Sequence, residues 1–472
     1  MANRHMARIM DLLQPVMGLC NKKRTLLDTI PFPFFSRPFP WVPALKQPHQ
    51  YTGMKNYLIP LCLLLISFAK AQTLLRPENV FDGETLHPSW VVVTKDNKIH
   101  YVGPEKGVPS PKPQQEVQLP GATLMPGLIE GHSHLLLHPY NETSWNDQVL
   151  KESPVERAIR GSVHASRSLL AGITTMRDLG SEGAGYSDVY LKGTIEQGLV
   201  NGPRLLVAGP AIVATGAYGP KGFHDGVTVP LGAEEASGVD ECIRTVRKQL
   251  GNGVDFIKIY ADYRLQKGGE PHATFSVEEI ASMVATAKSA GTYVVAHAST
   301  PEGMMRAIMG GVETIEHGDG GNGEVFALMQ KRGVALCPTL AAGEAMEEYG
   351  GWKKNGGPEP DRITAKKKSF QLALEAGTQL VFGGDVGVFS HGDNFRELEL
   401  MVEYGMSPLQ VLTCATSKNA DLFHLNDRGR LRTGLLADII AVEGDPLQKI
   451  EKMREIVFVM KDGVIYKNTG DE

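Results

Sequence analysis

Short apolar runs alternate with longer stretches of helical periodicity between residues 123 and 430. This alternation is typical of β/α units, in which helices join parallel strands. Runs with the length and composition of strands occupy residues 123–134, 173–179, 204–209, 254–260, 293–297, 313–317, 334–339 and 380–385. Helical spacing is found at 155–171, 236–251, 277–289, 304–309, 325–332 and 362–376. The pattern predicts an α/β fold, a (β/α)8 TIM barrel over residues 123–430.

Shorter strand patterns flank this region on both sides. Apolar runs at 74–81, 90–93 and 99–103 precede it, and Asp96-Asn97 is a hairpin signal between the last two. After a further expected helix over 409–425, strand patterns return at 437–442, 456–460 and 464–466. We therefore expect residues 72–122 and 431–472 to pair into one composite β-sandwich domain beside the barrel.

The N-terminal region has the pattern of an export signal. Lys55 precedes an apolar run at 58–68, and Ala69-Lys70-Ala71 follows it. The run is too short to span a bilayer core of ~30 Å, although a buried strand or helix could have the same composition. We expect a signal peptide over 54–71, an exported (periplasmic or secreted) protein and no stable membrane anchor after cleavage. Residues 1–53 show neither period, and we expect them to be disordered or not translated.

Composition and charge narrow the class of protein. A chain of 472 residues, 42% of them hydrophobic, can bury a sizeable core. The net charge of -5 and the lack of a long basic run argue against a nucleic-acid partner. The five cysteines contain no CxxC spacing, which argues against a disulfide framework and a cysteine zinc site.

Side chains that can bind metal end several of the predicted strands. His132 and His134 stand two residues apart, so both imidazoles lie on one face of a strand and can bind one ion. His297, His317 and Asp385 end later strands. A lone histidine at a strand end, or an aspartate after two glycines, more often has a structural role. Together, at the strand ends where barrel enzymes place their catalytic groups, they predict a metal site.

Lys258 lies inside the apolar run at 254–260. A buried ammonium group without a partner is costly, so this lysine must be paired, neutral or chemically modified. Pairing with a carboxylate is the simplest of these alternatives.

The order His-x-His, Lys, His, His, Asp resembles the amidohydrolase superfamily in its binuclear form, over residues 73–469. The resemblance implies two divalent metal ions, with zinc expected, and a CO2-derived carbamate on Lys258 that bridges them. It places His132, His134 and Asp385 on one ion and His297 and His317 on the other. It further implies that a hydroxide shared by the metals attacks the substrate carbonyl, while Asp385 moves a proton to the leaving nitrogen.

The segments Asp-Phe-Ile-Lys-Ile-Tyr at 255–260 and Glu-His-Gly at 316–318 are similar to those of Xaa-Pro dipeptidases, related carboxypeptidase-like enzymes and ochratoxin-hydrolysing amidases. That similarity implies hydrolysis of an amide bond to a C-terminal amino acid, in a dipeptide-like or other small-molecule substrate. The alternatives are hydrolysis of cyclic amides, lactones or phosphotriesters on the same centre, or a non-catalytic barrel scaffold. A homo-oligomer is compatible with either.

Four further residues could contribute to the site or to its packing. Tyr260 shares a strand face with Lys258, and similar peptidases use a tyrosine here to polarise the carbonyl; packing at the barrel mouth is the alternative. His224 could line the substrate pocket as a catalytic residue or hold a loop turn. Arg177 and Asp178 are expected to form an internal ion pair.

Overall fold

The computed structural model describes residues 72–471. The expectations for residues 1–53 and for the signal peptide at 54–71 lie outside this range. Within 72–471, no helix combines the length and apolarity that a membrane span requires.

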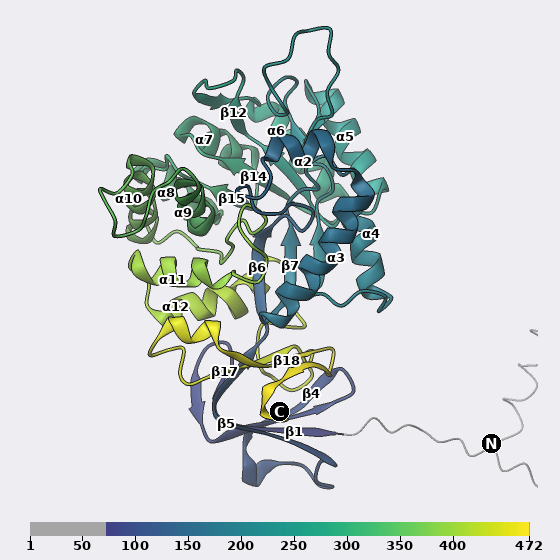
Figure 1. The fold of residues 1–472 in the computed structure, drawn as a ribbon, viewed down its shortest axis with the longest axis vertical. Helices are drawn as coiled ribbons and strands as arrows, with labels where there is room; N and C mark the ends of the chain where they lie inside the picture. Colours follow the sequence, from purple (N-terminus) through teal and green to yellow (C-terminus); the bar gives the residue numbers. More distant parts are fainter. Residues whose placement is uncertain (1–71, 472) are drawn as a thin grey trace, which may run out of the picture. The chain divides into compact units, whose positions relative to one another are not determined.

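Strands from the N-terminal and C-terminal segments together form one sheet, which lies at the lower end of the molecule in Figure 1. The strands of this terminal sheet, within the described chain, are β1 (Thr73–Phe81), β2 (Leu86–Pro88), β3 (Trp90–Lys95), β4 (Lys98–Pro104), β5 (Gln115–Pro126), β17 (Ile439–Glu443), β18 (Ile456–Lys461) and β19 (Val464–Asn468). β5 joins the two halves, because it runs parallel to β1 on one side and antiparallel to β17 on the other. In place of a sandwich of two separate sheets, all eight strands belong to one hydrogen-bonded sheet.

The central strands form two sheets whose paired strands are all parallel. One sheet contains β6 (Leu128–Ser133), β7 (Ile173–Asp178) and β8 (Arg204–Val207). The other has the order β10-β9-β11-β14-β15-β16. Its strands are β9 (Ile212–Val213), β10 (Glu234–Glu235), β11 (Ile257–Tyr260), β14 (Val294–Ala298), β15 (Thr314–His317) and β16 (Ala335–Cys337). A hairpin of β12 (Asp262–Arg264) and β13 (Pro271–Ala273) follows β11.

Isolated main-chain hydrogen bonds connect the edges of these sheets. The amide of Asp255 donates to the carbonyl oxygen of Val207 (2.8 Å), which links the start of β11 to β8. The amide of Gly131 donates to the carbonyl oxygen of Phe382 (2.9 Å), which links β6 to the segment after α10. One continuous eight-stranded barrel is not observed among the described residues, because 380–385 makes only single bridges, such as Leu336 with Leu380.

Two glycines explain why 380–385 is not a regular strand. A Cβ at Gly383 would lie 2.6 Å from the sulfur of Cys337, so the chain passes too close to β16 for a side chain. The amide of Gly384 donates to Oε1 of Glu130 (2.9 Å) in place of a strand partner. Because this segment does not pair in a regular strand ladder, Asp385 can adopt a left-handed backbone conformation (φ 62°).

The first predicted strand, 123–134, is divided at Gly127. Residues up to Pro126 pair with β17 in the terminal sheet, whereas β6 begins at Leu128. The amide of Gly127 donates to the carbonyl oxygen of Asp438 (2.9 Å), and a Cβ here would lie 2.2 Å from the Thr174 side chain. Gly127 is therefore the point at which the chain crosses between sheets.

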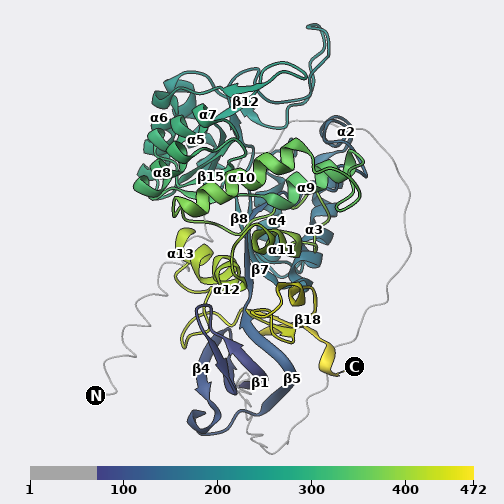
Figure 2. The ribbon, with the colours of Figure 1, turned by 90° about the vertical axis from the view of Figure 1, so that its left-hand side faces the viewer.

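Helices surround the central strands in both views (Figures 1 and 2). They are α2 (Trp145–Lys151), α3 (Pro154–Leu170), α4 (Ser187–Glu196), α5 (Val239–Gly251), α6 (Val277–Ser289), α7 (Pro301–Gly310), α8 (Gly323–Arg332), α9 (Leu340–Tyr349), α10 (Asp361–Glu375), α11 (Phe395–Glu403), α12 (Pro408–Thr413) and α13 (Asn419–Leu422). Six of these match predicted helices within three residues at each end. The predicted helix over 409–425 is confirmed over most of its length, because α12, a π-helical turn at Cys414–Lys418 and α13 follow one another without a gap from 408 to 422. Apolar side chains of the helices and central strands form one large buried core.

Candidate active site

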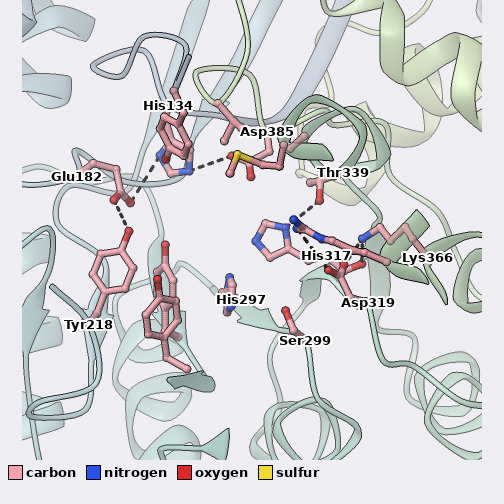
Figure 3. Close-up of a pocket in the computed structure, with 18 residues that line it drawn as sticks. His134, Glu182, Tyr218, His297, Ser299, His317, Asp319, Thr339, Lys366 and Asp385 are labelled. Atoms are coloured by element: carbon pink, nitrogen blue, oxygen red, sulfur yellow. Dashed lines mark hydrogen bonds and ion pairs between the residues drawn. The ribbon is translucent and has the colours of Figure 1, made fainter. Parts of the chain in front are cut away.

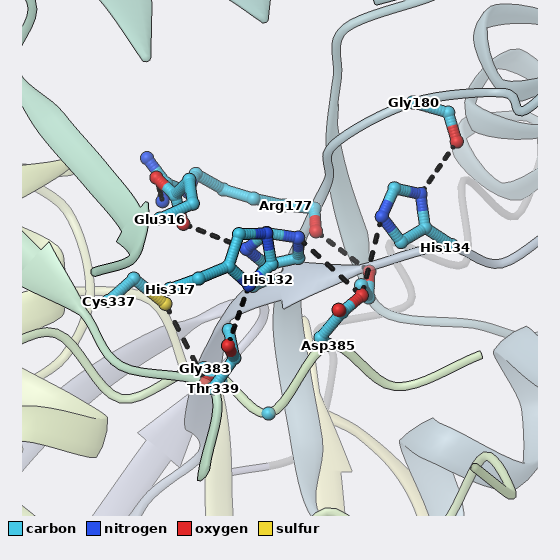
Figure 4. Close-up of polar contacts among 12 residues, drawn as sticks. His132, His134, Arg177, Gly180, Glu316, His317, Cys337, Thr339, Gly383 and Asp385 are labelled. Carbon is cyan, nitrogen blue, oxygen red and sulfur yellow. Dashed lines mark hydrogen bonds and ion pairs between the residues drawn. The ribbon is translucent and has the colours of Figure 1, made fainter. Parts of the chain in front are cut away.

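The carboxyl ends of the central strands bring the predicted ligands together (Figure 4). Ligand atoms of His132, His134 and Asp385 all lie within 4.8 Å of one another. Oδ1 of Asp385 is 3.6 Å from Nε2 of His132 and 3.4 Å from Nε2 of His134. The His317 ring lies 5.0 Å from that of His132 and 4.5 Å from that of His297, measured between centroids. The four histidines thus form a continuous cluster with the aspartate.

Hydrogen bonds at Nδ1 orient three of these imidazoles. The partners are Glu316 Oε2 for His132 (2.8 Å), the Gly180 carbonyl oxygen for His134 (2.9 Å) and Thr339 Oγ1 for His317 (2.8 Å). An imidazole fixed through Nδ1 presents Nε2, which is the usual arrangement around a protein-bound metal. Within residues 72–471, Nε2 of His132 has no hydrogen-bond partner although it is buried.

Lys258 is fully buried on β11, and its Nζ finds no hydrogen-bond partner in the described part of the chain. Burial lowers the pKa of this amine, which favours its neutral form. The simplest predicted alternative, direct pairing with a carboxylate, is not seen within residues 72–471. A neutral buried amine is the form that can react with CO2.

Burial also keeps the histidines neutral, because it lowers the pKa of His132 and His317 well below the usual value and that of His297 to about 3. Nearby basic groups, Lys258 among them, lower these pKa values further. Neutral imidazole is the metal-binding form. Burial raises the pKa of Asp385, although His134 and Lys258 oppose the shift. Among the described residues, Oδ1 of Asp385 also lacks a hydrogen-bond partner. Unpartnered donor atoms on neutral imidazoles and on a converging carboxyl group fit a divalent metal site.

Arg177 does not pair with Asp178, and this prediction is wrong. Its guanidinium binds Oε1 of Glu316 (3.2 Å) and lies 3.9 Å from the centre of the Phe423 ring. Asp178 instead accepts a hydrogen bond from the amide of Leu135 (2.9 Å). Adjacent residues of a strand point to opposite faces, so a carboxylate on another strand is the better partner for Arg177.

A cavity of about 260 Å³ opens beside the cluster and is lined by His134, His297, His317 and Asp385 (Figure 3). Its two sides differ in charge. On one side, Glu182 accepts hydrogen bonds at Oε2 from the Tyr218 hydroxyl (2.6 Å) and from Nε1 of Trp145 (2.8 Å).

On the opposite side, Asp319 pairs with Lys366, whose Nζ also donates to the carbonyl oxygen of His317 (2.8 Å). Arg362 lies beside this pair and is about half-exposed, with a side-chain exposure of 49%. Its guanidinium is 3.9 Å from both Asp319 and Glu347, beyond hydrogen-bond distance.

Tyr260 lines this cavity, whereas His224 lies outside it. The Tyr260 ring stacks on His297 with 4.4 Å between centroids. This position beside the predicted metal ligands is compatible with both predicted roles, polarisation of the substrate carbonyl and packing at the barrel mouth. Burial, and then the charge of Glu182, raises the pKa of the Tyr260 phenol well above its usual value. His224 is exposed, and its Nδ1 accepts a hydrogen bond from the amide of Gly226 (3.1 Å). This contact supports the loop-turn alternative and not the catalytic one.

Sequence reasoning missed Glu182, Tyr218, Asp319 and Lys366. Glu182 and Asp319 each follow a predicted strand within a few residues, so the rule that selected His317 could have found them. Tyr218 lies in a loop and Lys366 on a helix, where no local pattern distinguishes them from surface residues.

Comparisons with known proteins identify the family. The model of the amidohydrolase family matches residues 123–466. This chain belongs to the amidohydrolase family. An ochratoxinase from Aspergillus niger is 31% identical over 421 residues, which cover 82% of this chain and 85% of that protein.

Solved structures in this family agree. A Xaa-Pro dipeptidase with methionine bound in its active site is 30% identical, with a TM-score of 0.74, over 84% of this chain and 100% of that chain. A prolidase in complex with N-methylphosphonate-L-proline is 27% identical, with a TM-score of 0.71 and the same coverage. These neighbours imply a TIM-barrel domain with an additional domain, and this amidohydrolase is a hydrolase that acts on C–N bonds. The family generally binds divalent metals, and the His/Asp group described above provides the candidate ligands.

Proposed function

We propose that this amidohydrolase cleaves the amide bond to a C-terminal amino acid, as a dipeptidase, carboxypeptidase or N-acyl amino acid amidase with a binuclear metal centre. The observation that carries the proposal is the buried Nζ of Lys258, which has no hydrogen-bond partner within residues 72–471. Its strand, β11, lies beside β14, which carries His297, and β15, which carries His317, is the next strand in the same sheet. The names of the similar proteins, an ochratoxinase and a Xaa-Pro dipeptidase, support an amide substrate.

The donor set would serve two divalent ions. His132, His134 and Asp385 would hold one, and His297 and His317 the other, while Lys258, as a carbamate, would supply an anionic ligand to both. When bound, divalent ions supply Lewis-acid polarisation of the carbonyl and lower the pKa of water toward ~7. Zinc suits imidazole and carboxylate donors of this kind.

Two residues of the chain would act on the substrate itself. Asp385, whose pKa burial raises, would accept a proton as the nucleophile attacks and donate it to the leaving nitrogen. The Tyr260 hydroxyl stays protonated because its pKa is raised, so it can donate a hydrogen bond to the carbonyl oxygen.

Arg362 would recognise the carboxylate of the C-terminal amino acid. Its guanidinium lines the cavity and is not within hydrogen-bond distance of Asp319 or Glu347, so its donors remain available. A planar guanidinium matches a carboxylate in bidentate geometry. Arg362→Met should raise KM for dipeptides with a free carboxylate and leave KM unchanged for the same compounds amidated at the C-terminus.

The substrate class is tested with metal-loaded protein. We expect turnover of a library of dipeptides and N-acyl amino acids, loss of turnover after chelation, recovery with Zn²⁺, and about two metal ions per chain by elemental analysis. Activity confined to lactones, cyclic amides or phosphotriesters would reject the proposal.

The modified lysine is tested separately. Lys258→Ala should remove most activity, and a short carboxylic acid such as formate or propionate should partly restore it by occupying the space of the carbamate. Lys258→Arg, which cannot be carboxylated and retains a charge, provides the matched control without rescue. Absence of rescue in Lys258→Ala with both metals bound would count against the carbamate.

Export is also part of the proposal, because the apolar run at 58–68 followed by Ala-Lys-Ala has the pattern of a cleaved signal. Mass spectrometry of the exported protein should find an N-terminus at Gln72. Recovery of peptides from residues 1–53 in that protein would contradict it.

A further inference from the structure

One wall of the cavity is aromatic and contains a buried negative charge. We name it the tyrosine wall, and its members are Tyr140, Glu182, Tyr218, Tyr260 and Tyr263. The rings of Tyr218, Tyr260 and Tyr263 contact one another with centroids 4.7 to 5.7 Å apart. Nothing in the hydrolytic chemistry proposed above requires four phenols at one side of the pocket.

Glu182 is only 2% exposed, and its two oxygens differ. Oε2 accepts hydrogen bonds from Trp145 and Tyr218, whereas Oε1 has no hydrogen-bond partner among the described residues. Arg157 lies close by, but its guanidinium donates to main-chain carbonyl oxygens, among them that of Glu182 (2.6 Å), and not to the carboxylate. A buried carboxylate with an unused acceptor is expensive unless a cationic group can approach it.

Aromatic faces around a negative charge form the surface that proteins use to bind ammonium and guanidinium groups. We propose that the tyrosine wall binds a positively charged group on the acyl half of the substrate, either a free α-ammonium or a basic side chain. The inference rests on the proposed function, because that function sets the direction in which the substrate lies in the cavity. If Arg362 holds the C-terminal carboxylate at one side of the cavity, the acyl half extends toward the opposite side, where Figure 3 shows Glu182 and Tyr218.

A competing role for Glu182 is to position His134, because Oε1 lies 3.9 Å from Nδ1 of that ring. That distance is too long for a hydrogen bond, and Nδ1 already donates to the Gly180 carbonyl oxygen. The two roles predict different results. A residue that positions His134 affects every substrate equally, whereas a cation-binding residue affects only substrates that carry the charge.

The test uses binding, so that it does not depend on turnover. Three ketomethylene analogues of a dipeptide, in which CH2 replaces the amide nitrogen, are titrated calorimetrically into metal-loaded protein. One has a free α-ammonium and a norleucine side chain, the second an acetylated amine and a lysine side chain, and the third an acetylated amine and norleucine. At least one cationic analogue should bind about ten- to thirtyfold more tightly than the neutral third, and the comparison identifies which cation is recognised.

Glu182→Gln retains an oxygen for Trp145 and Tyr218 but removes the charge, and it should abolish this preference while leaving affinity for the neutral analogue unchanged. Glu278→Gln, an identical change on the exposed first turn of α6, is the control and should keep the wild-type preference. Equal binding of all three analogues by the wild-type protein, or an unchanged preference in Glu182→Gln, would overturn the inference. An equal loss for all three would assign Glu182 to His134 and would also overturn it.

The cation site and the proposed function can be refuted independently of each other. Preference among the analogues without hydrolysis of the corresponding amides would refute the function and retain the cation site. Hydrolysis of charged and neutral amides with equal kcat/KM, together with equal analogue binding, would refute the cation site and retain the function.

Discussion

Replacing Lys258 by methionine should make the metal-free protein more stable. Lys258 is fully buried on β11, and its amine has no hydrogen-bond partner within the described residues. Methionine has nearly the same length and flexibility, so it can retain the packing of the lysine stem while removing the polar group.

The expected gain follows from the desolvation of the amine. A polar group buried without a compensating hydrogen bond costs about 1–3 kcal/mol in proteins. Burial lowers the pKa of Lys258, which favours the neutral amine over the ammonium as the buried form. We therefore expect the free energy of unfolding to rise by about 1–3 kcal/mol, while hydrolytic activity is lost.

Lys461 provides a matched control, because it is also buried and its pKa is also lowered by burial. Its Nζ, however, donates to the carbonyl oxygen of Gly202 (2.8 Å). Lys461→Met leaves that oxygen unsatisfied and should lower stability by about 1–3 kcal/mol. The two substitutions are thus expected to have effects of opposite sign.

The assay is urea unfolding of chelated, CO2-depleted protein, followed by tryptophan fluorescence for the wild type and both variants. Destabilisation of Lys258→Met comparable to that of Lys461→Met would show that the Lys258 amine has a partner in the folded protein. Full activity of Lys258→Met after reloading with metal would refute its role in the centre.

Three further predictions concern the surroundings of the centre. Asp385→Asn should fold normally, judged by circular dichroism, but lower kcat by roughly 10²–10⁴-fold, the usual contribution of a proton-transferring group; an unchanged kcat would remove Asp385 from that role. Glu316→Gln, which weakens the hydrogen bond that orients His132, should lower metal affinity about 10–100-fold in a competition titration with a chelator, and wild-type affinity would show that His132 is oriented by other contacts. Burial raises the pKa of Glu397 from 4.5 to about 8, so its contribution to stability is complete below about pH 4.5 and is lost as pH rises toward 8. Glu397→Gln should flatten the decline of unfolding free energy between pH 5 and 8 by at most about 5 kcal/mol, and parallel pH profiles for the two proteins would contradict this.

Much of the candidate site followed from local sequence. Apolar runs that carry His132, His297 and His317 near their ends are strands in the structure, and parallel strands joined by helices place their carboxyl ends at one rim. The residues that can bind metal could therefore be grouped before their distances were known. The unusual position of Lys258 inside an apolar run likewise indicated a buried amine.

Only the tertiary structure decided the contacts that join distant parts of the chain. The crossing at Gly127 and the irregular segment around Gly383 depend on neighbours that are remote in sequence. Periodicity reports which side of an element is buried, but it does not identify the partner that lies there.

The same limit applies to the residues around the metal cluster. His224 and Glu182 both follow strand-like segments, yet one is exposed in a loop turn and the other is buried between Trp145 and Tyr218. Arg177 pairs with Glu316, 139 positions away, because adjacent strand residues face opposite sides and its sequence neighbour, Asp178, points elsewhere. The sequence by itself thus determined which side chains can bind metal and the strands that present them. The folded chain decided which partners orient those side chains and how charge is distributed over the walls of the pocket, because hydrogen bonds and ion pairs form between residues that only folding brings together.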